Sequence, residues 1–194
     1  MSAAAVILAA GESRRMGFPK ALLRYREETF LDTLIGLFSA RCSQVIVVLG
    51  AHGDRIREGT RRSATFVTNP DYQRGQTTSM QCGLRAVPPD TDGVLFTLVD
   101  HPAVQPATVD VLLEGRGMPS PLIRVPRYQG QRGHPVWFHR EMLAEFLELP
   151  EGGAASQIVR SHAAETEFLD VDDGGILADI DDAAAYVRLT GVAL

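Results

Sequence analysis

The chain has 194 residues, of which 45% are hydrophobic and 22% charged, with a net charge of −5 at pH 7. This length and composition predict one globular domain spanning residues 1–194. The acidic balance argues against nucleic acid as a partner, because nucleic-acid surfaces need clustered Lys and Arg. No apolar run is long enough to span a bilayer and no basic signal region opens the chain, so we expect a cytoplasmic protein without membrane contact.

Residues 3–10 form an unbroken apolar run, which predicts a strand buried on both faces of a parallel sheet. The loop that follows, residues 11–20, holds two glycines together with Arg14, Arg15 and Lys20. Glycines allow a sharp turn that presents backbone N–H groups to an anion. Because open α/β sheets bind ligands beyond the carboxyl ends of their strands, the loop predicts a polyphosphate cradle. The alternative is a tight turn with basic residues on its surface.

The next apolar patterns alternate between helix and strand. A helix is expected at residues 29–41, where Thr29 and Asp32 approximate a capping box. Strands are expected at residues 44–49, 64–68 and 93–99, with an amphipathic helix before the last of them. This alternation implies right-handed parallel crossovers, and therefore an α/β domain with a mostly parallel sheet and helices on both faces.

Polar residues follow two of these strands. Residues 75–79 are expected to form a polar loop that opens a helix and offers backbone N–H groups and hydroxyls to a base or ribose, although simple N-capping by Thr77 or Thr78 explains them equally well. Asp100 directly follows the strand at residues 93–99 and is expected on the same rim as the opening loop. A magnesium ion that bridges phosphates needs an oxygen ligand there, and a helix cap is the alternative role.

The alternation breaks in the second half of the chain. Two β-prone runs, residues 119–125 and 136–139, are separated by a glycine-containing segment and indicate a hairpin. Short helices are expected at residues 140–147 and 152–162, followed by a last strand at residues 167–171.

Residues 8–20, LAAGESRRMGFPK, resemble the signature L-A-A-G-x-S-x-R-M-G-x-P-K of molybdenum cofactor cytidylyltransferases and molybdopterin-guanine dinucleotide synthases. The resemblance implies a Rossmann-like, three-layer nucleotidyltransferase fold. It also implies a reaction in which a substrate phosphate attacks the α-phosphorus of a nucleoside triphosphate and releases pyrophosphate. In that family the loop wraps the triphosphate, and Arg15 and Lys20 match the residues that neutralise the developing charge.

The resemblance assigns most nucleotide contacts to the opening loop. The expected nucleotide-binding residues are Leu8, Ala9, Ala10, Gly11, Glu12, Ser13, Arg14, Arg15, Met16, Gly17 and Lys20, with Asn69, Gly75 and Ser79 from later segments. Ala10 stands where guanylyltransferase relatives tend to have glycine, and its methyl disfavours a purine, so CTP is favoured and GTP is the alternative. Arg15, Lys20 and Asp100 are the expected catalytic residues.

Two further motifs resemble the family. Asp100 matches the acidic residue of a D-x-P motif and Asp181 matches a second acidic position near the C-terminus, so the pair is expected to bind Mg²⁺. Capping of a helix by Asp181 and Asp182 is the alternative. A G-H-P motif implies a second-substrate pocket, and its expected residues are His101, Pro102, Gly133 and His134. The roles of His52 and Asp179 stay open, as does the contribution of His101.

The second substrate implied is a molybdopterin-type cofactor, and the implied partner is a molybdoenzyme or its chaperone. Two alternatives are a transferase acting on a sugar or polyol phosphate and a non-catalytic subunit that binds nucleotide and delivers cofactor. Lys20 and Arg15 lie in a polar loop, so replacing either with Ala is expected to cost no more than about half a kcal/mol of stability.

Overall fold

The computed structural model describes residues 2–114 and 121–193, and its main sheet has the strand order β10-β7-β9-β6-β1-β4-β5, with β8 paired to β7. The main-sheet strands are β1 (Ala3–Ala9), β4 (Gln44–Leu49), β5 (Thr65–Thr68), β6 (Gly93–Leu98), β7 (Ile123–Tyr128), β8 (Gln131–Arg132), β9 (Val136–His139) and β10 (Thr166–Asp170). Strands β2 (Arg24–Tyr25) and β3 (Glu28–Thr29) form a separate antiparallel pair. Parallel pairings join β4, β5 and β6 to the β1 half of the sheet, which confirms the predicted α/β class.

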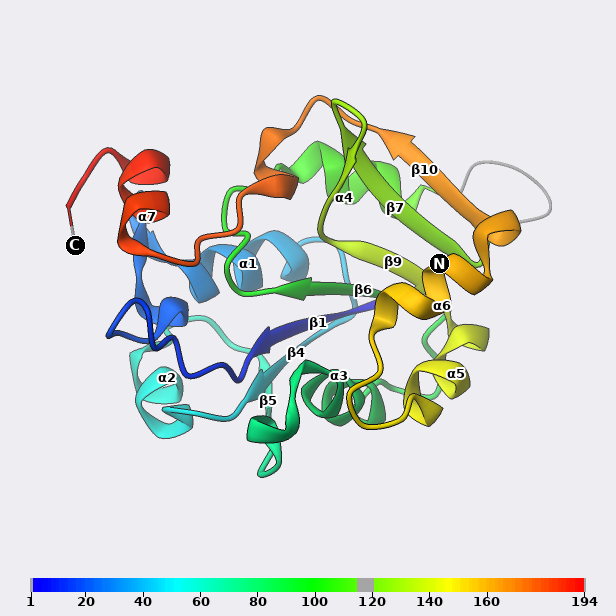
Figure 1. Ribbon diagram of the computed structural model, residues 1–194, viewed down its shortest axis with the longest axis horizontal. Helices are drawn as coiled ribbons and strands as arrows, with labels where there is room; N and C mark the ends of the chain where they lie inside the picture. The colour runs from blue at the N-terminus through cyan, green and yellow to red at the C-terminus, as the bar shows by residue number, and fades with distance from the viewer. Residues whose placement is uncertain (1, 115–120, 194) are drawn as a thin grey trace.

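Strand β1 lies at the centre because it is apolar on both faces, and all of its residues are buried. Ile7 belongs to a hydrophobic cluster under α1, α4 and α7, whereas Val6 and Leu8 belong to the opposite cluster under α3, α5 and α6. Figure 1 shows α1 and α3 on opposite sides of this strand. The helices are α1 (Phe30–Ser39), α2 (Gly53–Gly59), α3 (Gln76–Arg85), α4 (Pro106–Leu113), α5 (Leu143–Glu148), α6 (Ala155–Ser161) and α7 (Ala183–Thr190).

Short 3-10 segments connect several of these elements: η1 (Lys20–Leu22), η2 (Tyr72–Arg74), η3 (Arg140–Met142), η4 (Ala163–Glu165) and η5 (Gly174–Leu177). Helix α1 begins where the sequence predicts, since the Thr29 hydroxyl accepts a hydrogen bond from the Asp32 N–H at 3.0 Å. It ends at Ser39, two residues before the expected boundary. None of the helices in the described ranges is both long and apolar enough to cross a membrane.

Helix α3 packs unusually close to the sheet. A Cβ on Gly83 would lie 2.6 Å from Val6 Cγ1 and 2.7 Å from Val48 Cγ2, so only glycine lets the helix rest directly on β1 and β4. The first turn of α3 is thereby held beside the carboxyl ends of these strands. The segment expected as a loop at residues 75–79 is mostly this first turn, because α3 begins at Gln76.

The predicted hairpin is confirmed, since β7 and β9 pair antiparallel and β9 lies between β6 and β7. The strand expected at residues 119–125 is described only from residue 121, and β7 begins at Ile123. The buried Arg124 guanidinium lies over the Trp137 ring, 4.2 Å from its centroid, and donates to the Leu112 carbonyl at 2.9 Å. This residue therefore ties β7 to β9 and α4.

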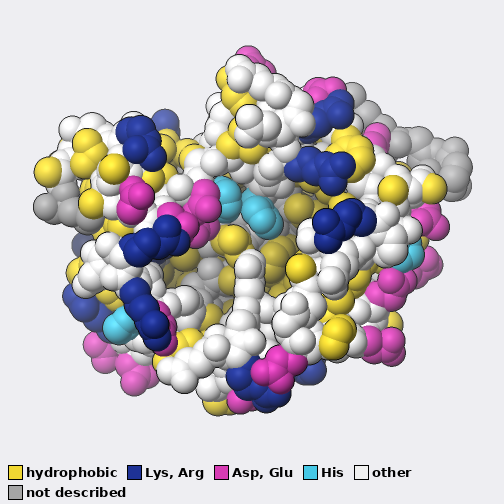
Figure 2. Space-filling model, in the orientation of Figure 1, with side chains coloured by type: hydrophobic (Ala, Val, Ile, Leu, Met, Phe, Trp, Pro, Cys, Tyr) yellow, Lys and Arg dark blue, Asp and Glu magenta, His cyan; other side chains and the backbone are white. Residues whose placement is uncertain are grey.

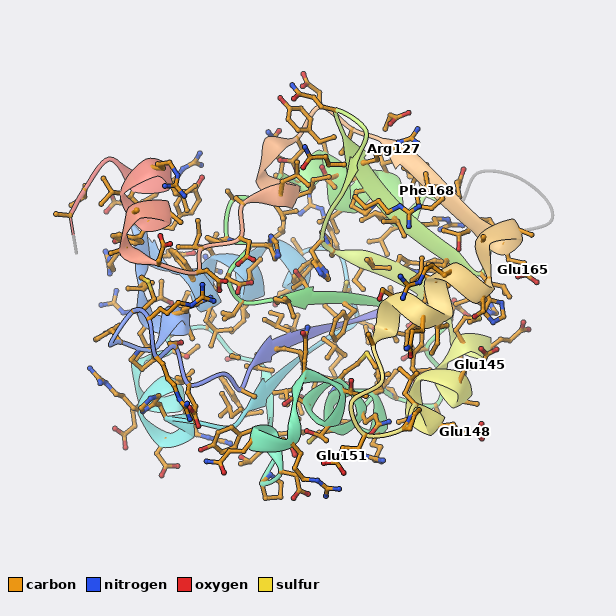
Figure 3. The ribbon with its side chains drawn as sticks, in the orientation of Figure 1. Arg127, Glu145, Glu148, Glu151, Glu165 and Phe168 are labelled. Carbon is orange, nitrogen blue, oxygen red and sulfur yellow. The ribbon has the colours of Figure 1, made fainter. Side chains whose placement is uncertain are left out.

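Helix α6 is anchored at its end by a histidine between two carboxylates. His162 Nε2 lies 2.8 Å from Glu145 Oε2 on α5, and its Nδ1 lies 3.0 Å from Glu165 Oε2 on η4. Figure 3 shows Glu145 and Glu165 on these neighbouring segments. The hydrogen bond with Glu145, together with the charge of both carboxylates, raises the pKa of His162.

We expect His162→Gln to lower the free energy of unfolding more near pH 5 than near pH 8.5. Because the folded-state pKa is raised, the stabilisation is complete below the unfolded pKa of about 6.5 and is lost as the pH rises through the folded pKa. The effect should stay below about 1 kcal/mol, since the carboxylates are half exposed. Urea unfolding at both pH values measures it, with His139→Gln as the control. An equal loss at both pH values would contradict the ion-pair assignment.

Candidate active site

The loop after β1 forms one wall of a cavity of about 660 Å³, which we call the first cavity. Its other walls come from the ends of β1 and β6 and from the first turn of α3. Of the residues expected from the sequence, those that line it are Leu8, Ala9, Ala10, Gly11, Glu12, Ser13, Arg14, Arg15, Lys20, Gly75, Ser79, Asp100 and Asp181. Residues from four separate parts of the sequence therefore meet in one cavity, as expected from the carboxyl-end rule for parallel sheets.

The loop is folded around Ser13. This residue has φ of 52°, its carbonyl accepts the Met16 N–H at 3.0 Å, and its hydroxyl accepts the Lys20 N–H at 3.2 Å. Gly17 follows with φ of 65°, a left-handed conformation that favours glycine. The turn reverses the chain between the arginines and Lys20, so that both ends of the loop face the same cavity.

Three residues expected to contact nucleotide lie outside the lining of the first cavity. Met16 packs partly buried against the hydrophobic core, and Gly17 forms the turn. Asn69 is buried, and its amide donates to Ser79 Oγ at 3.0 Å and to Thr78 Oγ1 at 2.9 Å. Asn69 thus stabilises the first turn of α3 by hydrogen bonds made outside the first cavity.

Lys20 is the centre of the charged network. Its Nζ lies 3.0 Å from Asp100 Oδ2 and 2.5 Å from Asp181 Oδ1, and its side chain is only 12% exposed. Burial alone would lower the pKa of Lys20, but the two carboxylates outweigh it and the pKa is raised. Arg15 Nη2 reaches Asp181 Oδ2 at 2.6 Å. The hydrogen bond from Lys20, helped by Arg15, lowers the pKa of Asp181.

Asp179 joins Asp100 and Asp181 in a cluster whose carboxylate oxygens lie within 4.8 Å of one another. The segment is held in place by the Ile180 N–H, which donates to the Asp100 carbonyl at 3.2 Å. Burial, together with the neighbouring charges of Asp100 and Asp181, raises the pKa of Asp179. Asp100 Oδ1 is buried without a hydrogen-bond partner within the described part of the chain. Clustered carboxylate oxygens of this kind fit a hard divalent cation such as Mg²⁺ or Mn²⁺.

A second cavity of about 620 Å³ adjoins the first and shares Gly75 and Gln76 with it. Gly133 and His134, the residues of the G-H-P motif, line the second cavity together with the apolar side chains of Met80, Phe96, Val125, Phe138 and Phe146. Figure 2 shows histidine side chains in a central hollow, with Lys and Arg side chains on both sides of it. Two cavities of similar size thus meet beside the first turn of α3.

His101 and Pro102 are buried and line neither cavity. The His101 ring lies 5.0 Å from the His134 ring, and its Nε2 lies 3.7 Å from Asp100 Oδ1. Burial is the main cause that lowers the pKa of both imidazoles to about 4. His101 therefore separates the carboxylate cluster from the second cavity, without facing that cavity itself.

Some residues of the two cavities were not anticipated. Tyr72, Gln73 and Gln76 line the first cavity, and Arg132 and Arg160 line the second. The polar composition of residues 72–78 is a signal that could have indicated the first three, whereas nothing local distinguishes Arg132 or Arg160 from other surface arginines. His52 has a left-handed backbone with φ of 59° directly before α2, and it lines neither cavity.

Comparisons with known proteins agree with this architecture. The family described as the MobA-like NTP transferase domain matches residues 5–166. The molybdenum cofactor cytidylyltransferase of Escherichia coli is 28% identical over 178 residues, covering 91% of this chain and 89% of the relative. A probable molybdenum cofactor guanylyltransferase of Mycobacterium avium is also 28% identical, over 188 residues, covering 95% and 93%.

Solved structures extend the likeness to the whole fold. The crystal structure of Rv0371c from Mycobacterium tuberculosis superposes with a TM-score of 0.87 at 32% identity, covering 98% of both chains. A complex of Rv0371c with manganese gives a TM-score of 0.83 at 30% identity over the full length of both. These findings confirm the family resemblance of the opening signature. The chain belongs to the MobA-like NTP transferase domain family and is a nucleotidyltransferase.

Proposed function

We propose that this protein transfers CMP from CTP to the phosphate of a molybdopterin-type cofactor, with Mg²⁺ bound and pyrophosphate released. The observation that carries the proposal is the placement of Lys20 between Asp100 and Asp181 in a cavity that opens into a second one. A donor nucleotide and an acceptor can then meet beside the same charged cluster. The curated relatives named for the molybdenum cofactor support the acceptor class.

In the proposed reaction an oxygen of the acceptor phosphate forms a bond to the α-phosphorus of CTP. The bond between that phosphorus and the bridging oxygen of the β-phosphate breaks, and pyrophosphate leaves with the electron pair. Lys20 and Arg15 supply fixed positive charge where negative charge accumulates. The attacking phosphate is already anionic, so the step needs no general base.

The three aspartates are the proposed holders of the divalent cation. Asp100, Asp179 and Asp181 supply the oxygen ligands, and the unpartnered Asp100 Oδ1 fits such a role. A divalent cation bound there neutralises charge on the phosphates. The manganese complex of Rv0371c supports a divalent cation in this fold, and the choice of Mg²⁺ is part of the proposal.

The preference for CTP rests on Ala10. This residue lines the first cavity and is buried, and we expect its methyl to disfavour the larger purine base. A relative named for cytidylyl transfer and one named for guanylyl transfer are each 28% identical to this chain, so transfer of GMP from GTP is the alternative.

The apolar second cavity favours an acceptor with a ring system over a sugar or polyol phosphate. Phe96, Phe138 and Phe146 give it aromatic walls, which match the face of a ring system. A cofactor product would next be delivered to a molybdoenzyme or its chaperone, which is the partner we propose.

CTP with Mg²⁺ should raise the melting temperature more than GTP with Mg²⁺ at equal concentration. Only binding to the native state stabilises it, so the larger shift identifies the tighter ligand. A thermal-shift series over the four nucleoside triphosphates measures this. A shift with GTP that equals or exceeds that with CTP would remove the cytidylyl assignment and leave the fold unaffected.

Lys20→Ala and Arg15→Ala should each lower turnover by about a hundredfold, the usual effect of losing a fixed charge that faces a transferring phosphoryl group. Lys20→Ala should also cost about 1–2 kcal/mol of stability, because its buried ammonium balances two carboxylates. This exceeds what the sequence alone suggests for a loop residue. Pyrophosphate-release rates and urea midpoints test both points. Arg14→Ala is the matched control, since that side chain is 83% exposed and should matter less.

Asp100→Asn should keep the fold but lower turnover roughly a hundredfold, since one charged ligand of the proposed cation disappears. The amide can still accept the hydrogen bond from Lys20, which protects stability. A manganese titration and pyrophosphate-release rates provide the measurement. Near wild-type rates and manganese affinity would show that the cation binds elsewhere.

A further inference from the structure

Two arginines line the second cavity and come from different elements of the fold. Arg132 comes from β8 and Arg160 from α6, and both line the cavity. The Arg132 guanidinium stacks on the Phe168 ring, 4.4 Å from its centroid, and Arg160 lies near Ser156 Oγ at 3.5 Å. Neither takes part in the ion pairs formed among residues 2–114 and 121–193. Their charges are therefore available to a ligand.

Arg127 provides a contrast within the same neighbourhood. It also approaches the Phe168 ring, at 6.0 Å, and Figure 3 shows Arg127 and Phe168 on the adjacent strands β7 and β10. Its guanidinium, however, donates to both carboxylate oxygens of Asp170, at 2.7 and 2.8 Å. Arg127 does not line the second cavity. Arg127 and Arg132 thus both contact Phe168, but the charge of Arg127 is already balanced by Asp170.

The walls of the cavity indicate what such a ligand looks like. Phe96 and Phe138 provide apolar surface, and His134 lies among the lining residues with a pKa lowered to about 4, so it carries no charge at neutral pH. Arg74 also lines the cavity, but its guanidinium pairs with Glu151 at 2.5 Å. The cavity therefore combines a flat apolar interior with unbalanced positive charge from Arg132 and Arg160, which suits a planar ring bearing an anionic group.

That anionic group is not the phosphate that attacks the nucleotide. The attacking phosphate must reach the α-phosphorus in the first cavity, where Lys20 and Arg15 lie. Arg132 and Arg160 line only the second cavity. An acceptor whose phosphate lies beside Lys20 would present a different part of itself to these arginines.

We propose that Arg132 and Arg160 are specificity-determining residues, which pair with a second anionic group of the acceptor, separate from its attacking phosphate. The acceptor class is then a planar heterocycle that carries both a phosphate monoester and a further anionic substituent. The identity of the reaction rests on the proposed function, whereas the anion subsite itself rests on the two arginines and the cavity.

The first experiment measures steady-state turnover with CTP, Mg²⁺ and molybdenum cofactor. Arg132→Gln and Arg160→Gln should each raise the KM for the cofactor by about tenfold, the loss expected for one charge-assisted contact. The kcat and the KM for CTP should stay within about twofold, and Arg132→Lys should recover part of the loss. Arg127→Gln is the matched control and should behave as wild type, with urea midpoints confirming that all variants fold. A fall in kcat or a change in the KM for CTP would overturn the subsite.

The second experiment measures binding without turnover. Fluorescence titrations of the CTP- and Mg²⁺-saturated protein compare pterin-6-carboxylate with uncharged pterin. Wild type and Arg127→Gln should bind the carboxylate about tenfold more tightly than Arg132→Gln or Arg160→Gln, and all four should bind pterin equally. Equal binding of the carboxylate by all four, or no binding, would overturn the subsite. Should this contrast hold while wild type shows no transfer, the proposed function fails and the subsite stands.

Discussion

The interaction on which the site depends is the contact of one buried lysine with two carboxylates of a three-aspartate cluster. Lys20 comes from η1, Asp100 follows β6, and Asp179 and Asp181 follow η5, so the network joins three distant parts of the chain. Three carboxylates this close repel one another, and burial together with the charges of Asp100 and Asp181 raises the pKa of Asp179. Lys20 offsets part of it and leaves oxygen ligands for a cation, which makes the cluster a charged centre ready for phosphates.

Backbone hydrogen bonds and strand pairing fix the positions of Lys20 and the three aspartates relative to one another. Strands β1 and β6 are neighbours in the sheet, so the loop after β1 and Asp100 emerge side by side at their carboxyl ends. The Ile180 N–H bonds to the Asp100 carbonyl and brings the C-terminal aspartates to the same point. Gly83 lets α3 rest on the sheet and carry its first turn to the rim of both cavities. Backbone contacts therefore set the site geometry before any ligand binds.

Because the two cavities share one rim, a donor nucleotide and an acceptor can bind next to each other. The first turn of α3 borders both cavities, and Thr77 Oγ1 on that turn donates to the Gly153 carbonyl on the rim of the second. The ion pair of Arg74 with Glu151 adds a second link between the same segments. The segments that border the two cavities are therefore held together by direct contacts.

The sequence by itself determined the opening strand, its loop, the parallel α/β class and the family, because a buried strand and a thirteen-residue signature are local patterns. It also indicated Asp100, which follows a strand whose carboxyl end meets that of β1, and Asp181, which matches an acidic position of the family. Only the tertiary structure decided that Asp179 joins them, that Asn69 hydrogen-bonds to α3 outside the first cavity, and that Arg132 and Arg160 line one cavity. These facts depend on side-chain contacts between elements far apart in the chain, which no local pattern encodes.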